Sequence, residues 1–163
     1  MKTPTTLYKK QGNITLFWRI NCQDNNSVSI LWGYVGKSIG SRVKSFNTYE
    51  STLAFYHDLT NRIKQSFNDN PNISRYRVNI RIKNYVPAFS TSDPFVETTY
   101  QMYEAIKDVL EYNGNGSTGT MKIENDILTI PFNAIDSQMA LNSIRDVLVG
   151  FGIGRNRLLF LPQ

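Results

Sequence analysis

The stretch RYRVNIRIK, residues 75–83, constrains the fold of this chain more than any other, because apolar and polar side chains alternate through it without interruption. Successive side chains of a strand point to opposite faces, so one face of this strand is apolar and the other is polar. The apolar members are Tyr76, Val78, Ile80 and Ile82, and the cationic members are Arg75, Arg77, Arg81 and Lys83. The pattern predicts a half-buried strand with one strongly basic face.

The residues after this strand predict two helices and three further strands. Asp93 is a candidate helix cap with Pro94 at the first helical position, and Asp136 is a candidate cap for a second helix. Two short strands flank a turn at Asn125 and Asp126, and RLLFL, residues 157–161, reads as a last strand. The order strand, helix, strand, strand, helix, strand matches the ferredoxin-like arrangement. The expected interior of the first helix is Phe95, Met102, Ile106, Val109 and Leu110.

The first half of the chain predicts three strands followed by a helix. Alternating apolar residues mark strands at 14–22 and 28–32, and a third strand at 41–46 follows the expected turn GKSIG. The period then changes: Asn47, with Glu50 three residues later, has the spacing of a capping box, and a helix is expected to run to about residue 67. The turn cluster NDNPN, residues 68–72, separates the halves. We therefore expect an α+β protein with domains at 1–70 and 71–163, and the sequence leaves open which half contains the strand at 75–84.

Composition excludes several classes of site. The 163 residues include one cysteine, Cys22, and one histidine, His57, too few for a disulfide framework or an ordinary zinc site. Neither a signal-peptide pattern at the N-terminus nor an apolar run long enough to span a bilayer is present in the sequence. We expect a cytoplasmic protein with no membrane partner, no metal and no cofactor, and we expect Cys22 to be buried.

Charge is divided unevenly between the two halves. Residues 1–92 contain 13 Lys or Arg against 4 Asp or Glu, whereas residues 93–163 contain 5 against 9, within a formal net charge of +5. A basic half of this kind indicates an anionic partner, although a solvated basic surface is the ordinary alternative.

The segment WGYVG, residues 32–36, precedes the short strand GSRVKSF and a helix containing AFYHDLTNRIK. This ordered set resembles the WGR domain, a family with a Trp-Gly-Arg motif on a strand, a Val-Gly just after it, and a helix with a central phenylalanine. The matching positions over residues 15–67 are Trp32, Gly33, Val35, Gly36, Phe46 and Phe55.

The resemblance implies nucleic-acid binding, DNA included. It implies that Trp32 packs against a terminal nucleotide and that the motif arginine contacts the backbone. In this chain the motif arginine is replaced by Tyr34, which has no guanidinium to bind phosphate in the bidentate manner. The replacement removes the guanidinium through which, by the resemblance, the family recognises DNA ends.

The candidate nucleic-acid-binding residues are aromatic or cationic. Cations neutralise backbone phosphates while aromatic rings stack on bases. In the first half, the set comprises Trp32, Tyr34, Lys37, Arg42, Lys44, Arg62 and Lys64. The alternatives are that Trp32 is a core residue in phase with Val28 and Ile30, and that the cations form a solubilising surface.

The second part of the candidate set is the basic face of the strand at 75–84, with Arg75, Arg77, Arg81 and Lys83. Like charges on one face repel, so either a polyanion or acidic residues of the same chain are expected to offset them. The acidic candidates are Glu97, Glu104, Asp108 and Glu111.

Catalytic signals are weak. His57 and Asp58 are adjacent on the expected helix and do not face each other, and no nucleophile set or carboxylate pair stands out. We therefore expect a non-enzymatic nucleic-acid-binding module. The alternative is a protein-interaction or assembly module that docks a protein partner or a second copy through the same surface or through sheet edges.

Overall fold

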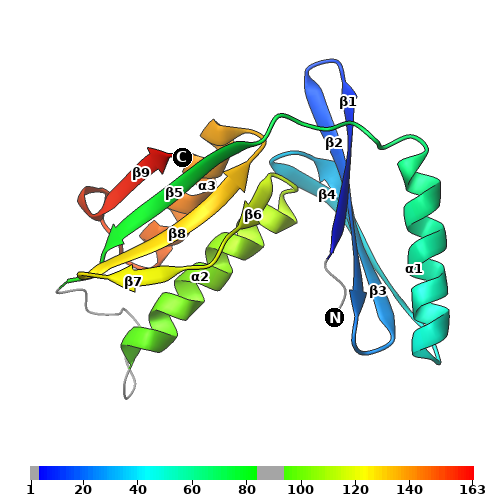
Figure 1. The fold of residues 1–163 in the computed structure, drawn as a ribbon, viewed down its shortest axis with the longest axis horizontal. Coiled ribbons are helices and arrows are strands. Elements are labelled where there is room, and N and C mark those ends of the chain that lie inside the picture. The colour runs from blue at the N-terminus through cyan, green and yellow to red at the C-terminus, as the bar shows by residue number, and fades with distance from the viewer. Residues whose placement is uncertain (1–3, 84–93) are drawn as a thin grey trace. The chain divides into compact units, whose positions relative to one another are not determined.

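The computed structural model describes residues 4–83 and 94–163 and has an α+β fold, as the sequence predicts (Figure 1). The chain divides into two compact units. Unit 1 comprises residues 1–72 and 112–114, and unit 2 comprises residues 73–111 and 115–163.

Unit 1 is a four-stranded antiparallel sheet with one helix against it. The strands β1 (Thr5–Gln11), β2 (Ile14–Gln23), β3 (Ser27–Tyr34) and β4 (Lys37–Ser45) are neighbours in chain order, and α1 (Tyr49–Lys64) follows. The buried core between the helix and the sheet is formed by Ile20, Cys22, Val28, Ile30 and Tyr56. The expected burial of Cys22 is confirmed.

The structure differs from the sequence predictions at four points in unit 1. Strand β1 was not predicted, and β4 begins at Lys37, so the stretch read as the turn GKSIG is largely strand. The N-cap of α1 is Thr48 rather than Asn47, since the Thr48 side chain accepts a 3.2 Å hydrogen bond from the Ser51 amide. The helix ends at Lys64, three residues earlier than expected.

Two segments outside the sheet and α1 complete unit 1. Asp69 lies beside β1, where its amide donates to the Tyr8 carbonyl and its carboxylate accepts from the Lys10 amide. The segment 112–114 belongs to this unit as well, and the Asn113 carbonyl accepts a 2.8 Å hydrogen bond from the Gly36 amide.

Unit 2 has the ferredoxin-like βαββαβ order that the sequence predicts, with the short strand β6 in addition. Its elements are β5 (Ser74–Arg81), α2 (Pro94–Tyr112), β6 (Gly116–Thr118), β7 (Lys122–Glu124), β8 (Ile127–Ala134), α3 (Ser137–Gly150), the 3-10 helix η1 (Arg155–Arg157) and β9 (Leu158–Pro162). The sheet order is β6-β8-β5-β9, with β7 also paired to β8, and every pairing is antiparallel. The question of which half contains the strand at 75–84 is thereby answered: it is a central strand of unit 2.

The predicted alternation of β5 determines where the helices pack. Val78, Ile80 and Ile82 are buried, in one core with residues of α2 and α3. Both helices therefore cover the apolar face of the sheet, and the arginines of β5 lie on the other face. The α2 and α3 residues of this core are Met102, Ile106, Leu110, Ala140, Ile144 and Leu148.

Two local predictions in unit 2, the turn at Asn125 and Asp126 and the helix cap at Asp136, are confirmed by the structure. Asn125 and Asp126 have positive φ of 51° and 62° and join β7 to β8. The Asp136 side chain caps α3 by accepting a 2.9 Å hydrogen bond from the Met139 amide. The predicted cap at Asp93 lies outside the described residues. Strand β6 was not predicted.

Candidate nucleic-acid interface

The register of the unit 1 sheet gathers most first-half candidate residues on one face. Residues paired across antiparallel strands share a face. Trp32 pairs with Trp18 on β2 and Gly40 on β4, Ile30 pairs with Arg42, and Val28 pairs with Lys44. Because Val28 and Ile30 belong to the core beneath α1, Trp32, Arg42 and Lys44 lie on the helix-covered face.

An aromatic row crosses this face. The rings of Trp18 and Trp32 are stacked, with centroids 5.4 Å apart and planes inclined by 21°. Phe67 meets Trp18 edge-on at 6.4 Å, and the Lys9 ammonium lies 5.8 Å from the Phe67 centroid. Trp32 is half-buried. Trp32 therefore packs against the core and still exposes part of its ring to solvent. The alternative that Trp32 is a core residue describes only its packed side.

A groove lies between the helix and β4. It has a volume of about 270 Å³ and is lined by Trp18, Ile30, Trp32, Arg42, Lys44, Phe55 and Leu59. The tryptophans and Ile30 come from β2 and β3, Phe55 and Leu59 come from α1, and the two cations come from β4. The groove is thus mainly apolar with cations on one side, and it is slightly smaller than the roughly 300–1,000 Å³ of typical small-molecule pockets.

Lys44 is held by aromatic rings at the border of the groove. Its ammonium lies 4.3 Å from the Phe55 centroid and 5.2 Å from the Phe46 centroid. A cation over an aromatic face is attracted by the ring quadrupole, which fixes the position of the charge. Arg42, two residues earlier on the same strand face, is exposed.

The other first-half candidates lie in three different settings. Tyr34 pairs with Lys37 and with Leu16, so it shares the helix-covered face with Trp32. Arg62 is bound to Asp58 by a 2.6 Å salt bridge, and both side chains are largely exposed. Lys64 is two residues from Arg62, which places it about 200° around the helix, on the other flank.

The second-half candidates form a separate group. Arg75, Arg77, Arg81 and Lys83 all belong to unit 2, and all four are exposed. The carboxylates of α2, one of the two alternatives that the sequence left open, do not offset these charges across the sheet, because the core layer separates α2 from the arginine face.

Among the described residues, Tyr8 has the largest pKa shift, and it lies on the opposite face of the unit 1 sheet. Burial raises the pKa of Tyr8 to about 12, and the nearby Arg19 guanidinium opposes this by favouring the phenolate. Tyr8 pairs with Phe17, not with a groove residue, so this perturbation belongs to the framework of the sheet.

Other kinds of site find little support in the described part of the chain. Residues 4–83 and 94–163 contain no cluster of three or more His, Cys, Asp or Glu side chains that could hold a metal ion. Among the helices of these residues, none is long and apolar enough to cross a membrane.

Sequence reasoning missed Trp18 as a site residue. Its in-phase position with Ile20 and Cys22 was visible, but its stacking on Trp32 depends on the pairing register of β2 with β3. A tryptophan on each strand of a predicted hairpin, at positions that the hairpin pairs directly, is the signal that could have found it.

Comparisons with known proteins add no family. No protein-family model matches the chain, and no curated protein matches it. Among solved structures, a homoserine dehydrogenase from Thiobacillus denitrificans aligns over 95% of this chain and 42% of its own chain, with 8% identity and a TM-score of 0.30. The chain thus spans less than half the length of that structure.

Proposed function

We propose that unit 1 is a non-enzymatic nucleic-acid-binding module of WGR type, and that the groove between α1 and β4 is its binding site. The observation that carries the proposal is the pair of stacked tryptophans in one groove with Arg42 and Lys44. Aromatic rings that stack on bases, beside cations that neutralise phosphates, form the usual combination at sites for single-stranded or terminal nucleotides.

The small groove volume supports a short segment of nucleic acid as the ligand. About 270 Å³ suits one base better than a larger group. Lys44 and Arg42 both come from β4, which is an edge strand of the sheet that the described residues form and pairs there with β3. A strand of nucleic acid running along β4 would place phosphates beside these cations while one base enters the groove.

The missing motif arginine has a candidate substitute. Lys37 is the register partner of Tyr34 and shares its sheet face. The lysine ammonium at this position can neutralise a phosphate, but it cannot form the bidentate hydrogen bonds of a guanidinium. We therefore expect backbone binding with less preference for a defined DNA end than the family resemblance alone would imply.

The test measures binding of labelled single-stranded DNA, blunt duplex DNA and duplex RNA by fluorescence anisotropy at two salt concentrations. Intrinsic fluorescence provides a second readout, since the two tryptophans of the chain both line the groove. We expect salt-sensitive binding, quenching of tryptophan emission by single-stranded ligand, and loss of both signals in Arg42→Glu/Lys44→Glu.

The matched control is Arg75→Glu/Arg77→Glu, which makes the same charge change in unit 2 and lowers the formal net charge from +5 to +1, as the groove variant does. This control should retain the tryptophan quenching. Absence of binding by the unmodified protein in low salt, or equal losses in the two variants, would overturn the proposal.

A further inference from the structure

One face of the unit 2 sheet carries no helix among the described residues. Helices α2 and α3 share a core with the apolar face, whereas the odd-numbered residues of β5 and their partners lie on the other side. We call this other side the open face. Its members from β5, β8 and β9 are Arg75, Arg77, Asn79, Arg81, Ile127, Thr129, Pro131, Asn133, Leu159 and Leu161.

The charge of the open face is not balanced within the described residues. Arg75, Arg77 and Arg81 are exposed, and none of the three forms a salt bridge with a carboxylate of residues 4–83 or 94–163. Lys122 and Glu124 of β7 are on the same face, and their charges cancel. Ile127 of β8 pairs with both Glu124 and Arg81 and so stands between them. Three cations on one strand therefore repel one another without an internal counter-charge.

The outer surface of α2 has the opposite character. At 100° per residue, four carboxylates fall on one stripe directed away from the buried residues Met102 and Ile106. We call this set the acidic stripe: Glu97, Tyr100, Gln101, Glu104, Asp108 and Glu111. Lys107 forms a 3.1 Å salt bridge with Glu104 at its border, so the stripe with this lysine carries a net charge of −3.

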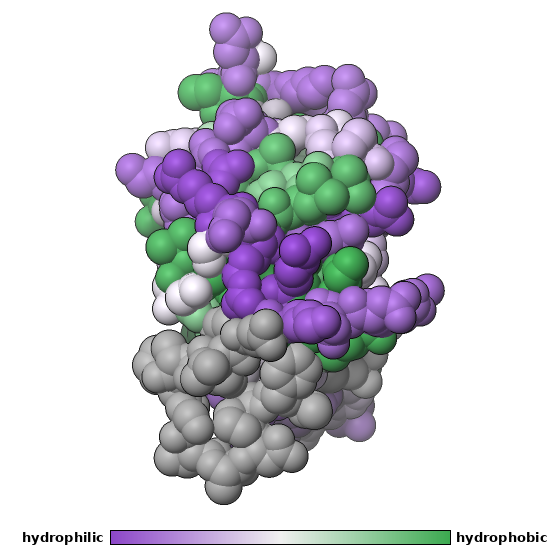
Figure 2. All heavy atoms as spheres, turned by 90° about the vertical axis from the view of Figure 1, so that its left-hand side faces the viewer, coloured by the Kyte–Doolittle hydropathy of each residue, from purple (hydrophilic) through white to green (hydrophobic). Residues whose placement is uncertain are grey.

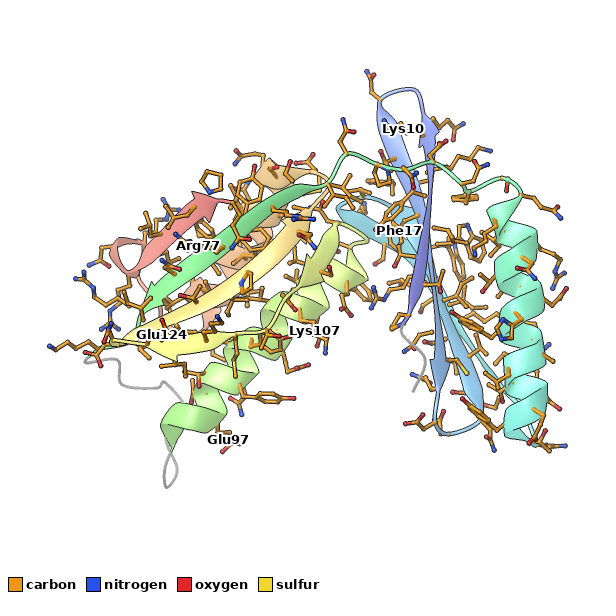
Figure 3. All side chains as sticks on the ribbon, viewed as in Figure 1. Lys10, Phe17, Arg77, Glu97, Lys107 and Glu124 are labelled. Atoms are coloured by element: carbon orange, nitrogen blue, oxygen red, sulfur yellow. The ribbon has the colours of Figure 1, made fainter. Side chains whose placement is uncertain are left out.

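The open face and the acidic stripe match in charge, length and polarity. The three arginines provide +3, and they span about 20 Å at roughly 3.4 Å per strand residue. From Glu97 to Glu111 the stripe spans about 21 Å at roughly 1.5 Å per helix residue. Leu159 of the open face is 55% exposed, and Tyr100 of the stripe is 54% exposed, so each surface also offers apolar area. Figure 3 labels Arg77 on β5 and Glu97 on α2.

The two surfaces cannot meet within one molecule, because the core of unit 2 lies between them. We propose that the open face binds the acidic stripe of α2 in a second copy of the chain. Charge complementarity would bring the copies together, and the exposed leucine and tyrosine surfaces would be buried at the contact.

A second copy fits this face better than nucleic acid does. The described residues of the open face include no aromatic side chain on which a base could stack, and its leucines would gain nothing from a phosphate backbone. Interfaces between proteins combine apolar and polar area, as the leucines and arginines of the open face do. On the side of the molecule that Figure 2 presents, hydrophobic and hydrophilic side chains are interleaved. Because the two docking surfaces differ, the contact is heterologous and extends to rings or open chains of copies.

The experiment is sedimentation velocity of the full chain at increasing concentration, in about 0.1 M and about 1 M salt, where the Debye length falls from about 10 Å to about 3 Å. We expect the average mass to rise above 18.7 kDa in the lower salt and to return to it in the higher salt. Arg75→Glu/Arg77→Glu and, separately, Glu97→Lys/Asp108→Lys should each raise the dissociation constant by more than about tenfold. An equimolar mixture of the two variants should associate again, because the unchanged open face of one variant meets the unchanged acidic stripe of the other, and their reversed surfaces are complementary as well.

The matched control is Arg42→Glu/Lys44→Glu, which has the same net charge as the open-face variant and should associate like the unmodified chain. Circular dichroism of every variant verifies folding. A mass of 18.7 kDa at all concentrations in low salt would overturn the proposal, as would association that survives either reversal. A monomeric chain that loses nucleic-acid affinity in Arg75→Glu/Arg77→Glu would assign the open face to nucleic acid and likewise overturn it.

Discussion

The indole of Trp32 lies over Gly40 on the neighbouring strand, so closely that a Cβ atom on Gly40 would come within 2.5 Å of Cζ2 of the ring. The backbone of Gly40 is not left-handed. Glycine is therefore required here for space and not for conformation, and the space it leaves determines where one wall of the groove lies.

Replacing Gly40 by alanine should destabilise unit 1 by about 1–3 kcal/mol, because the added methyl group overpacks against the indole. In an unobstructed strand the same change would stabilise by roughly 0.5–1 kcal/mol, so the sign of the effect is diagnostic. Urea unfolding of Gly40→Ala measures it. In a Trp32→Leu background the penalty should largely disappear, and an unchanged penalty there would show that the indole is not the obstacle.

Lys44 should contribute to stability through its charge as well as its stem. Lys44→Met keeps the apolar stem but removes the ammonium above Phe55 and Phe46, and should cost about 0.5–1 kcal/mol. Lys44→Arg retains a cation over the rings and should stay near the unmodified value. Denaturant unfolding of both variants checks this, and equal losses in both would argue against a role for the charge.

Tyr8 should make unit 1 sensitive to alkaline pH. Its pKa in the folded state is about 12, above the ordinary value of 10.0, because burial disfavours the phenolate. Below pH 10 the phenol is protonated in both states, whereas between pH 10 and 12 only the unfolded state readily loses the proton. Stability should therefore fall across this window by at most about 2–3 kcal/mol. Unfolding curves of the unmodified chain and Tyr8→Phe, compared from pH 8 upward, isolate the contribution, and identical pH dependence in the two would contradict it.

Gly150 and Gly152 provide a matched pair at the end of α3. A Cβ at either position would meet no atom within 4 Å, but Gly152 has a φ of +76° and Gly150 does not have a left-handed φ. Gly152→Ala should destabilise unit 2 by about 1 kcal/mol through backbone strain. Gly150→Ala should be neutral or stabilising by up to about 1 kcal/mol, since alanine favours the helix. Thermal unfolding of the two variants separates these outcomes, and a neutral Gly152→Ala would contradict the strain.

Local periodicity predicted the elements that have one clearly apolar face. The strand β5 and the helices α2 and α3 could be recognised because their buried residues recur with a fixed period. Strand β1 was missed because Leu7 and Tyr8 lie on opposite faces and both are partly buried. The strand therefore lacks the alternation of apolar and polar residues by which a strand is recognised. The start of β4 was missed because Gly40 resembles a turn residue, whereas its role depends on Trp32 from another strand.

The sequence predicted which types of residue form the candidate site, but not which of these residues lie together in the groove. Trp32, Arg42 and Lys44 could be identified from one segment of sequence. The addition of Trp18 to the groove required the β2–β3 register, and the pairing of Arg62 with Asp58 required a particular rotamer choice on α1. The separation of the β5 arginines from the carboxylates of α2 required knowing which sheet face the helix covers.

The assignment of residues 112–114 to unit 1 has a consequence for synthesis. Residues 1–72 emerge from the ribosome first, but the carbonyl of Asn113 that accepts from Gly36 follows only after about 40 more residues. At roughly 5–20 residues per second, this delay is on the order of 2–8 s. During that interval the turn between β3 and β4 lacks one of its hydrogen bonds, so the nascent chain passes through a stage in which this turn is held by fewer hydrogen bonds than in the folded protein.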